Sequence, residues 1–347
     1  MSSQTAVVSR PSSASRPALL RTGGLVVLVV VLALSVLLSL AVGSKSIPFS
    51  HVFDALLHGG DSDDALVVRT LRVPRTLLGV AIGVALGLAG ALMQALTRNP
   101  LADPGILGVN AGASAAVVTG IGVWGVTSPS GYVWLALAGA AIATVAVFLL
   151  GSTGRAAATP VRLALAGTAL SAVLSAYVSG VTLLDQQTFN SFRFWNVGAL
   201  AGRDLSVLRD TGAFMLVGAV IALGLARSLN AFALGDETGK ALGANLGRTR
   251  ALGVLAVTLL CGAATAAAGP IGFVGLTIPH VARLLTGPDQ RWVLPYSALL
   301  APILLLLADV AGRVIARPGE IEVGIVTAFI GAPVFIYLAR QRRMAEL

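Results

Sequence analysis

Charged side chains are scarce in this chain. Asp, Glu, Lys and Arg make up 11% of its 347 residues, and apolar residues make up 56%. Ordinary soluble domains have about 25% charged and roughly 45–50% apolar residues, so the composition predicts a membrane protein. At about 20 apolar residues per spanning helix, the chain has room for about ten spans with short loops. A fused soluble ATPase, kinase or oxidoreductase domain is therefore excluded.

Cysteine and histidine are almost absent. The one cysteine, Cys261, lies within an apolar run, and the three histidines, His51, His58 and His280, are far apart in the sequence. These counts exclude a disulfide framework and a thiolate metal site. No cluster of catalytic polar residues occurs at one depth of the expected spans. We therefore expect no enzyme, no metal site and no cofactor.

Long apolar runs, by contrast, fill most of the chain. Residues 1–22, rich in Ser, Ala and Arg, are expected to form a disordered cytoplasmic tail, and residues 23–347 to form the transmembrane domain. The eighth run is interrupted by Gly269 and Pro270, and such spans need neighbouring protein for their freed backbone groups. An all-α, polytopic protein with ten transmembrane helices is predicted, with a nine-span count as the alternative. The expected spans are 23–42, 75–97, 105–125, 132–151, 161–183, 211–229, 251–270, 271–287, 293–315 and 322–339.

The net charge of +9 is distributed unequally among the loops. With the N-terminus inside and ten spans, the inner segments hold 15 of the 24 Lys and Arg residues and the outer segments hold 9. Basic residues favour the cytoplasmic loops of multi-pass proteins. We therefore expect both termini in the cytoplasm and a plasma- or inner-membrane location. The charge belongs to the inner face and gives no reason to expect nucleic acid as a partner.

Two arginines flank a proline at the expected outer end of the second span, in Leu71-Arg72-Val73-Pro74-Arg75. The proline is expected to interrupt the helix and leave a rigid basic corner. One interpretation is a pair of anchors among the lipid headgroups. The other is a docking site for acidic side chains of an external partner, because Arg binds carboxylates through paired hydrogen bonds. The residues alone leave both interpretations open.

The longest inner loop, residues 229–250, superficially resembles a phosphate-binding loop. Between Gly235 and Gly239 it has three residues instead of four, and Ala241 follows Lys240 where the motif requires Ser or Thr. ATP binding by this loop is therefore rejected. We expect instead two short helices separated by Gly243, with apolar Phe232, Leu234 and Leu242 exposed for a protein contact.

Other features of the spans predict packing. Gly79, Gly83 and Gly87 share one face of the second span, which lets a neighbouring backbone approach closely. Asp309 is the only acidic residue deep within a span, and Arg313 lies one turn away, so we expect the two to pair. A lone carboxylate in a membrane is also a functional candidate. It is the residue on which an ion-coupled secondary transporter would depend.

Several long segments in a fixed order resemble the FecCD family of ABC-transporter permeases, the type II importer subunits that serve iron-siderophores, haem and cobalamin. The resemblance extends from the first span to the C-terminus. The segments that carry it are LRVPRTLLGVAIGVALGLAGALMQALTRNPLADPGILGVNAGAS (71–114), LGDETGKALG (234–243), GPIGFVGLTIPHVARLLTGPDQRWVLP (269–295) and LLLADVAGRVIARPGEIEVGIVTAFIGAPVFIYLAR (305–340).

The resemblance implies a type II ABC importer permease fold and its partners. Two permease subunits, identical or paralogous, would surround a central path in the bilayer. Two separate ATP-binding cassette ATPase subunits would lie beneath them, and an extracytoplasmic substrate-binding protein would dock on the outer face. The mechanism implied is a rocking of the two halves driven by ATP elsewhere, with no nucleophile or general base in this chain.

The resemblance also implies roles for particular residues. The docking residues are Arg72, Arg75 and Arg313. The cytoplasmic gate corresponds to Asn99 and Leu101, with a second element at Thr159 and Pro160, where this sequence departs from the family's pattern. The contact with the ATPase corresponds to Leu234, Gly235, Asp236, Glu237, Ala241, Leu242 and Gly243.

Ferric siderophores are the expected cargo, since they are the family's commonest one. Cobalamin and haem are the alternatives within the same class of importer, and an ion-coupled secondary transporter is the alternative from another class.

Overall fold

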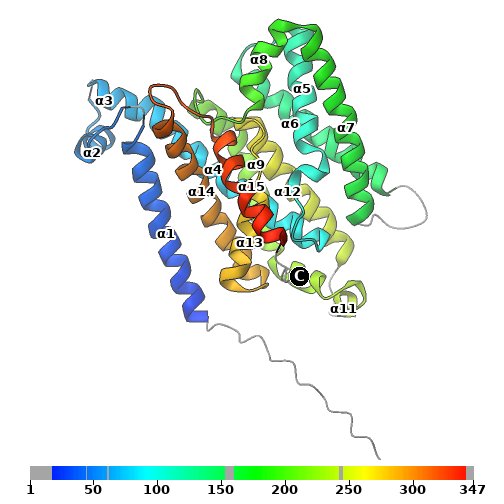
Figure 1. Ribbon diagram of the computed structural model, residues 1–347. Coiled ribbons are helices and arrows are strands. Elements are labelled where there is room, and N and C mark those ends of the chain that lie inside the picture. The colour runs from blue at the N-terminus through cyan, green and yellow to red at the C-terminus, as the bar shows by residue number, and fades with distance from the viewer. Residues whose placement is uncertain (1–17, 44, 61, 153–159, 242–244, 341–347) are drawn as a thin grey trace, which may run out of the picture.

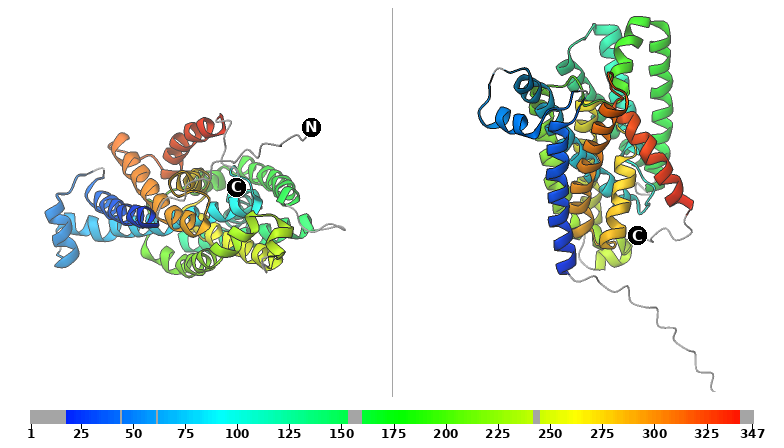
Figure 2. Two further views of the ribbon diagram at one scale, coloured as in Figure 1. Left: turned by 90° about the horizontal axis from the view of Figure 1, so that it is seen from below. Right: turned by 60° about the vertical axis from the view of Figure 1, so that its left-hand side comes forward.

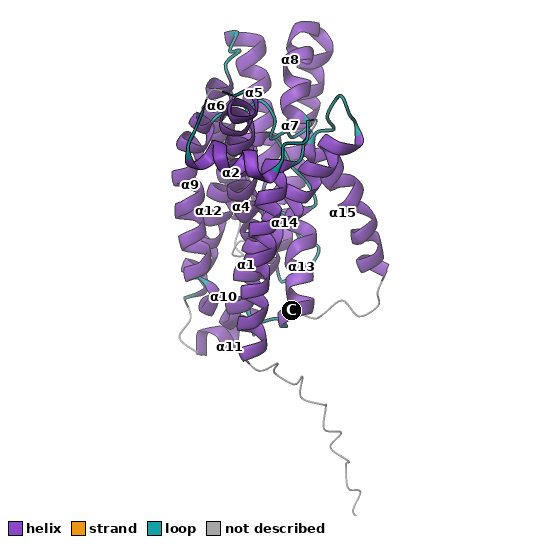
Figure 3. Ribbon diagram, turned by 90° about the vertical axis from the view of Figure 1, so that its left-hand side faces the viewer, coloured by secondary structure: helices purple, strands orange, loops and turns teal. Residues whose placement is uncertain are grey.

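The computed structural model describes residues 18–43, 45–60, 62–152, 160–241 and 245–340. All regular elements in these ranges are helices (Figure 3). The longer ones are α1 (Ala18–Ala41), α4 (Val73–Thr97), α5 (Val109–Trp124), α6 (Pro129–Ser152), α7 (Pro160–Leu184), α9 (Leu205–Gly224), α12 (Leu246–Ala268), α13 (Val274–Thr286), α14 (Gln290–Ile315) and α15 (Val323–Arg340). The shorter ones are α2 (Phe49–Leu57), α3 (Asp63–Leu66), the π-helical turn η1 (Val67–Arg72), the 3-10 turn η2 (Pro104–Leu107), α8 (Gln186–Asn196), α10 (Ala226–Ala233) and α11 (Asp236–Ala241).

Each of the ten expected spans corresponds to one of the longer helices. Within the described ranges, seven helices are long and apolar enough to cross a membrane, and α5 and α15 contain shorter apolar helices. Helix α13 has only 13 residues. The chain is thus an all-helical, multi-pass membrane protein, and the count of ten spans fits it. Helix α1 begins at Ala18, five residues before the expected boundary at Gly23. The preceding part of the expected tail lies outside the described residues.

The helices stand roughly side by side, with short helices gathered at the two ends of the bundle (Figure 1). We call the end with α2, α3 and α8 the outer end, after the orientation expected from the charges, and the end with α10 and α11 the inner end. Helix α1 begins and α15 ends towards the inner end (Figures 1 and 2). The ends of the described chain are therefore arranged as the predicted topology requires.

Helix α4 is the central helix of the bundle and packs against α14, α12, α13 and α9. A Cβ atom added at Gly83 would lie 2.4 Å from the Cα of Pro302, and one added at Gly87 would lie 2.4 Å from the carbonyl oxygen of Ser297. Both neighbours belong to α14. The predicted close approach along this glycine face is confirmed, because a larger residue would separate the two helices.

Helices α5 and α13 begin inside the bundle. At 1.5 Å per residue their 16 and 13 residues span about 24 and 20 Å, less than the ~30 Å hydrocarbon core of a bilayer. The expected helical starts at residues 105 and 271 were too early. Gly105 belongs to the 3-10 turn η2, and Phe273, just before α13, has a left-handed backbone with φ of 67°. We call α5 and α13 half-helices. The segments that precede them enter the bundle without forming an α-helix.

Candidate functional site

At the outer end, buried arginines hold the end of α1. Arg72 donates from its Nη1 atom to the carbonyl of Leu40 at 2.7 Å and from Nη2 to the carbonyl of Lys45. Arg313 donates to the carbonyls of Ser39 at 3.0 Å and Val42 at 2.9 Å. These guanidinium groups therefore satisfy carbonyl groups that the end of a helix leaves without partners.

The expected exposure of these arginines is thus corrected. Arg72 is 5% exposed and Arg313 is 2% exposed, so little of either side chain is accessible at the surface. The expected break at Pro74 is also wrong. Pro74 fits the first turn of α4, where its missing N–H leaves no gap. The irregularity lies one turn earlier, in the widened turn η1, which ends at Arg72.

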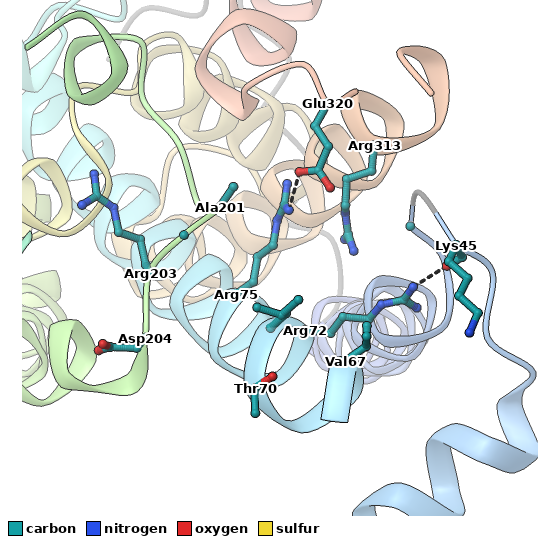
Figure 4. Close-up of a pocket in the computed structure, with 13 residues that line it drawn as sticks. Lys45, Val67, Thr70, Arg72, Arg75, Ala201, Arg203, Asp204, Arg313 and Glu320 are labelled. Carbon is teal, nitrogen blue, oxygen red and sulfur yellow. Dashed lines mark hydrogen bonds and ion pairs between the residues drawn. The ribbon is translucent and has the colours of Figure 1, made fainter. Parts of the chain in front are cut away.

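Arg75 occupies the centre of the outer charge network. Its Nε and Nη2 atoms donate to the Asp309 carboxylate at 2.8–3.0 Å, and its Nη1 atom donates to Glu320 at 2.6 Å (Figure 4). Arg313 also reaches Asp309, at 3.0 Å. The predicted pair of Asp309 and Arg313 is confirmed, and the bidentate partner, Arg75, comes from another helix. Asp309 side-chain atoms are 1% exposed, so two buried cations share one buried anion.

A pocket of about 530 Å³ opens above this network at the outer end. Arg75 and Glu320 line it together with Lys45, and the buried Arg72 and Arg313 contribute to its wall (Figure 4). Arg75 side-chain atoms are 11% exposed and those of Glu320 are 30% exposed. The pocket therefore presents a largely basic wall, with two carboxylates, Glu320 and Asp204, among its lining residues.

At the inner end, the predicted gate turn follows α4 directly. The backbone N–H of Leu101 donates to Asn99 Oδ1 at 2.9 Å, which closes a compact turn as expected for this sequence. Arg98, in a left-handed conformation with φ of 50°, ends the helix. Of the second gate element, Thr159 lies outside the described residues, and Pro160 begins α7.

The inner loop has the two short helices that we expected, α10 and α11, but they separate at Gly235, whose φ of 99° breaks the helix. Leu234 is 59% exposed, as predicted, whereas the exposure expected for Phe232 is wrong, because it is 1% exposed. Gly235 and Ala241 lie on this element together with Asp236 and Glu237, whose side chains are not described. Leu242 and Gly243 lie outside the described residues.

Phe232 is buried because two arginines, Arg98 from the turn after α4 and Arg250 from α12, lie against its ring. The guanidinium of Arg98 lies 4.4 Å from the centre of the Phe232 ring, and its Nη2 atom donates to the Phe232 carbonyl at 2.6 Å. Arg250 approaches the same ring at 5.6 Å. A cation over an aromatic ring is a favourable contact. These contacts connect α10 to the turn that follows α4.

A second link ties α10 to the start of α14. Asp289 accepts a hydrogen bond from Asn230 Nδ2 at 2.7 Å, and Asn230 in turn accepts one from the backbone N–H of Gln290 at 2.8 Å. Hydrogen bonds from Arg291 and Asn230 hold the pKa of Asp289 at about 2. The carboxylate is thus ionised at every physiological pH, and its contribution to stability is lost only as the pH falls from about 4 towards 2.

Comparison with known proteins decides the family. Residues 30–341 match the model of the FecCD transport family. The chain belongs to the FecCD family. Within this family, the ferric enterobactin transport system permease protein FepD of Escherichia coli (strain K12) is 49% identical over 315 residues, covering 91% of this chain and 94% of FepD.

Other similar FecCD proteins differ in the cargo for which they are named. The Fe(3+)-citrate import system permease protein YfmD of Bacillus subtilis (strain 168) is 44% identical, covering 88% of this chain and 91% of YfmD. The hemin transport system permease protein HmuU of Yersinia pestis is 36% identical, covering 93% and 96% of the two chains. A solved structure reported as an inward-facing metal-chelate type ABC transporter has a TM-score of 0.81 at 30% identity, covering 92% and 99%. This FecCD chain therefore has the fold of an ABC importer permease.

Two long-range contacts of the FecCD chain had no usable signal in the sequence. The contact of Arg98 with Phe232 joins residues 134 positions apart, and Ser39, whose hydroxyl accepts from Arg313 at 3.0 Å, lies 274 positions from its partner. The sequence showed the turn after α4, which begins at Arg98, and the aromatic Phe232 of the inner loop as two separate features. Nothing in either segment indicated the other.

Proposed function

We propose that this chain is the membrane-spanning subunit of a binding-protein-dependent ABC importer that moves ferric siderophores into the cytoplasm. The observation that carries the proposal is the exposed element at the inner end, which is linked through Phe232 and Arg98 to the gate turn. Such a link allows a separate ATPase to act on the path without any catalytic residue in this chain. Relatives named for ferric chelates are more similar to it than HmuU is, so haem is the second candidate cargo, and cobalamin remains an alternative.

The proposed cycle depends on two docking events at opposite ends of the bundle. A substrate-binding protein loaded with its cargo docks at the outer end, and ATP-binding cassette subunits bind the inner end around Leu234 and Gly235. ATP binding pushes α10 and α11 as the coupling helices, and the turn containing Asn99 and Leu101 moves with them. A second permease subunit, identical or paralogous, completes the path. Both termini lie in the cytoplasm in this arrangement.

Leu234→Asp is expected to abolish association with the ATPase subunit. Leu234 is 59% exposed on the inner surface, and burying an unpaired carboxylate at an apolar contact costs several kcal/mol, which corresponds to a loss of affinity of more than about a hundredfold. Co-purification of the ATPase subunit on size-exclusion chromatography measures the effect. The matched control is Leu57→Asp, on α2 at the outer end, where the leucine is 75% exposed. Unchanged association of the Leu234 variant would remove the coupling assignment.

We also propose that the outer pocket receives an acidic side chain of the substrate-binding protein. Arg75 is the most exposed of the three predicted docking residues, with 11% of its side chain accessible, and Arg72 and Arg313 add positive charge from beneath it. Glu320 and Lys45 are opposite charges on the same pocket, with 30% and 63% exposed side chains. Both are more exposed than Asp309, so they test the proposal while leaving the Asp309 carboxylate in place.

Glu320→Gln is expected to strengthen docking of the substrate-binding protein, and Lys45→Gln to weaken it. Each change is expected to be up to about fivefold, the upper end of the worth of an exposed ion pair. The dissociation constant is measured on the full chain in lipid nanodiscs, and both effects shrink at high salt. Equal dissociation constants for the two variants at low salt would contradict docking at this pocket.

A further inference from the structure

A polar cavity lies between α5, α7 and α8 and shares no lining residue with the outer pocket. Its volume of about 450 Å³ falls within the ~300–1,000 Å³ of sites that hold a small organic ligand. None of the ten described residues that line it carries a charge. The polar side chains among them are Asn110, Ser114, Ser171, Ser175, Ser179 and Asn196.

Helix α7 presents a continuous stripe of hydroxyl groups on the side of this cavity. At 100° per residue, Thr168, Ser171, Ser175, Ser179 and Thr182 fall within an arc of about 80°, along roughly 21 Å of the helix. The two threonines at its ends donate to carbonyls of their own helix. The three serines between them have no hydrogen-bond partner in the part of the chain that the structure describes. These three serines are the ones that line the cavity.

The other side of α7 is apolar. Leu170, Leu174 and Tyr177 line a separate cavity of about 380 Å³ together with alanine and leucine side chains of α5 and α6. Only 11% of the α7 span is buried within the chain, against 78% of the span that contains α4. Helix α7 therefore has an apolar side that faces α5 and α6 and a hydroxyl-bearing side that lines the polar cavity.

The wall opposite the serines is made by α5 and contains hydrogen-bonding groups held in fixed positions. Asn110 Oδ1 accepts from Thr265 at 2.8 Å, and this contact orients the amide. The Asn110 NH₂ group then has no partner among the described residues. Ser114 is 9% exposed, and its hydroxyl has one polar neighbour, Asn196 Oδ1, at 3.5 Å, which is the outer limit of a hydrogen bond. A buried hydroxyl with so weak a partner gains from a ligand or water in the cavity.

We propose that this cavity is a cargo-binding station on the transport path, and that it binds the oxygen-bearing organic surface of a metal chelate. The inference rests on the proposed function and adds a site to it. Serine hydroxyls and the Asn110 amide donate to carbonyl, hydroxyl and phenolate oxygens. The lining offers no carboxylate, imidazole or thiol, so it recognises the organic shell of a chelate and does not bind the bare ion. Neutral donors bind such a shell weakly enough to release it.

Cysteine accessibility tests whether the stripe faces a water-filled site. The single native cysteine, Cys261, is 2% exposed and gives little background. Ser175→Cys in the full chain, assembled with its partner subunits in nanodiscs, is expected to react with a water-soluble methanethiosulfonate at least about tenfold faster than Val173→Cys, because only a hydrated thiol ionises readily. Val173 is 66% exposed on the opposite side of α7. Ferric enterobactin is then expected to slow the reaction at Ser175→Cys.

Each outcome of this experiment decides part of the inference. Equal rates at the two positions would show that the stripe faces lipid or packs against another helix, and would overturn the site. A fast reaction that the chelate does not slow would overturn the ligand assignment. Disulfide cross-linking of Ser175→Cys between two copies would identify the stripe as a subunit contact instead.

A transport measurement separates this inference from the proposed function. The triple variant Ser171→Ala, Ser175→Ala and Ser179→Ala is expected to lower the rate of ferric enterobactin uptake at least about tenfold through loss of three hydrogen bonds, while ATP hydrolysis stays within about twofold. The control, Thr168→Ala with Thr182→Ala, removes hydroxyls bonded within the helix and is expected to retain uptake. If the wild-type importer takes up ferric enterobactin and the triple variant does so at the same rate, the binding station is overturned and the proposed function stands. No uptake by the wild-type importer would overturn the proposed function.

Discussion

Asp309→Asn is expected to lower the free energy of unfolding by about 3–5 kcal/mol, because it leaves two buried cations without their shared anion. Arg75 and Arg313 both contact the Asp309 carboxylate at 2.8–3.0 Å, and their side chains are 11% and 3% exposed. The amide keeps the shape of the side chain but carries no charge. Arg313 also holds the end of α1 through Ser39 and Val42, so the loss extends to the position of that helix.

Thermal unfolding of the purified chain in detergent measures this effect. The matched control is Glu320→Gln, which removes the other carboxylate bound to Arg75. Glu320 is 30% exposed, so its removal is expected to cost at most about 1 kcal/mol. Equal stability of the two variants would show that the buried charges are solvated and that the network does not hold the outer end together.

Gly90→Ala is expected to have a comparably large effect at the inner half of the bundle. A Cβ atom at Gly90 would lie 1.9 Å from the carbonyl oxygen of Gly275 and 2.5 Å from its Cα. The obstacle is backbone, so α13 must move away from α4 to admit a single methyl group. Overpacking of this kind costs about 3 kcal/mol or more when side-chain adjustment cannot relieve it, and displaces the start of the half-helix α13.

Two further alanine variants make the test a graded series. A Cβ atom at Gly275 would have its nearest neighbours at 3.2–3.4 Å, and one at Gly212, within α9, would meet only Leu208 at 3.8 Å. The expected order of damage is therefore Gly90→Ala, then Gly275→Ala, then Gly212→Ala, which is expected to be neutral or slightly stabilising. The midpoint of thermal unfolding and the rate of uptake should follow the same order. An undamaged Gly90→Ala protein would contradict the close contact of α4 with α13.

The sequence predicted the helices well and the functional contacts poorly, for physical reasons. Apolar runs of spanning length are a local signal, so each expected span corresponds to a helix of the structure. The starts of α5 and α13 were misplaced because the residues before these helices are as apolar as the residues within them. Where each helix begins depends instead on tight backbone contacts, such as that of Gly275 with Gly90. Local charge spacing revealed the pairing of Arg313 with Asp309. It could not reveal Arg75, which lies 234 positions from Asp309.

Burial was the other quantity that the sequence did not provide. Arg72 and Arg313 are polar residues near the end of an apolar run, a pattern equally compatible with lipid anchors and with docking groups. They are buried because the end of α1 supplies carbonyl oxygens to them. Phe232 was expected at the surface because its loop lies outside the expected spans, but Arg98 and Arg250 lie against its ring.

The central claim is that ATP hydrolysed by a separate subunit drives this chain to import a ferric chelate. The most direct measurement is uptake of iron-labelled enterobactin by proteoliposomes containing the complete importer and its substrate-binding protein. We expect uptake that requires ATP in the compartment facing the inner end, and none when a proton gradient is imposed without ATP. Uptake driven by the proton gradient alone would contradict the account and would identify the chain as an ion-coupled transporter.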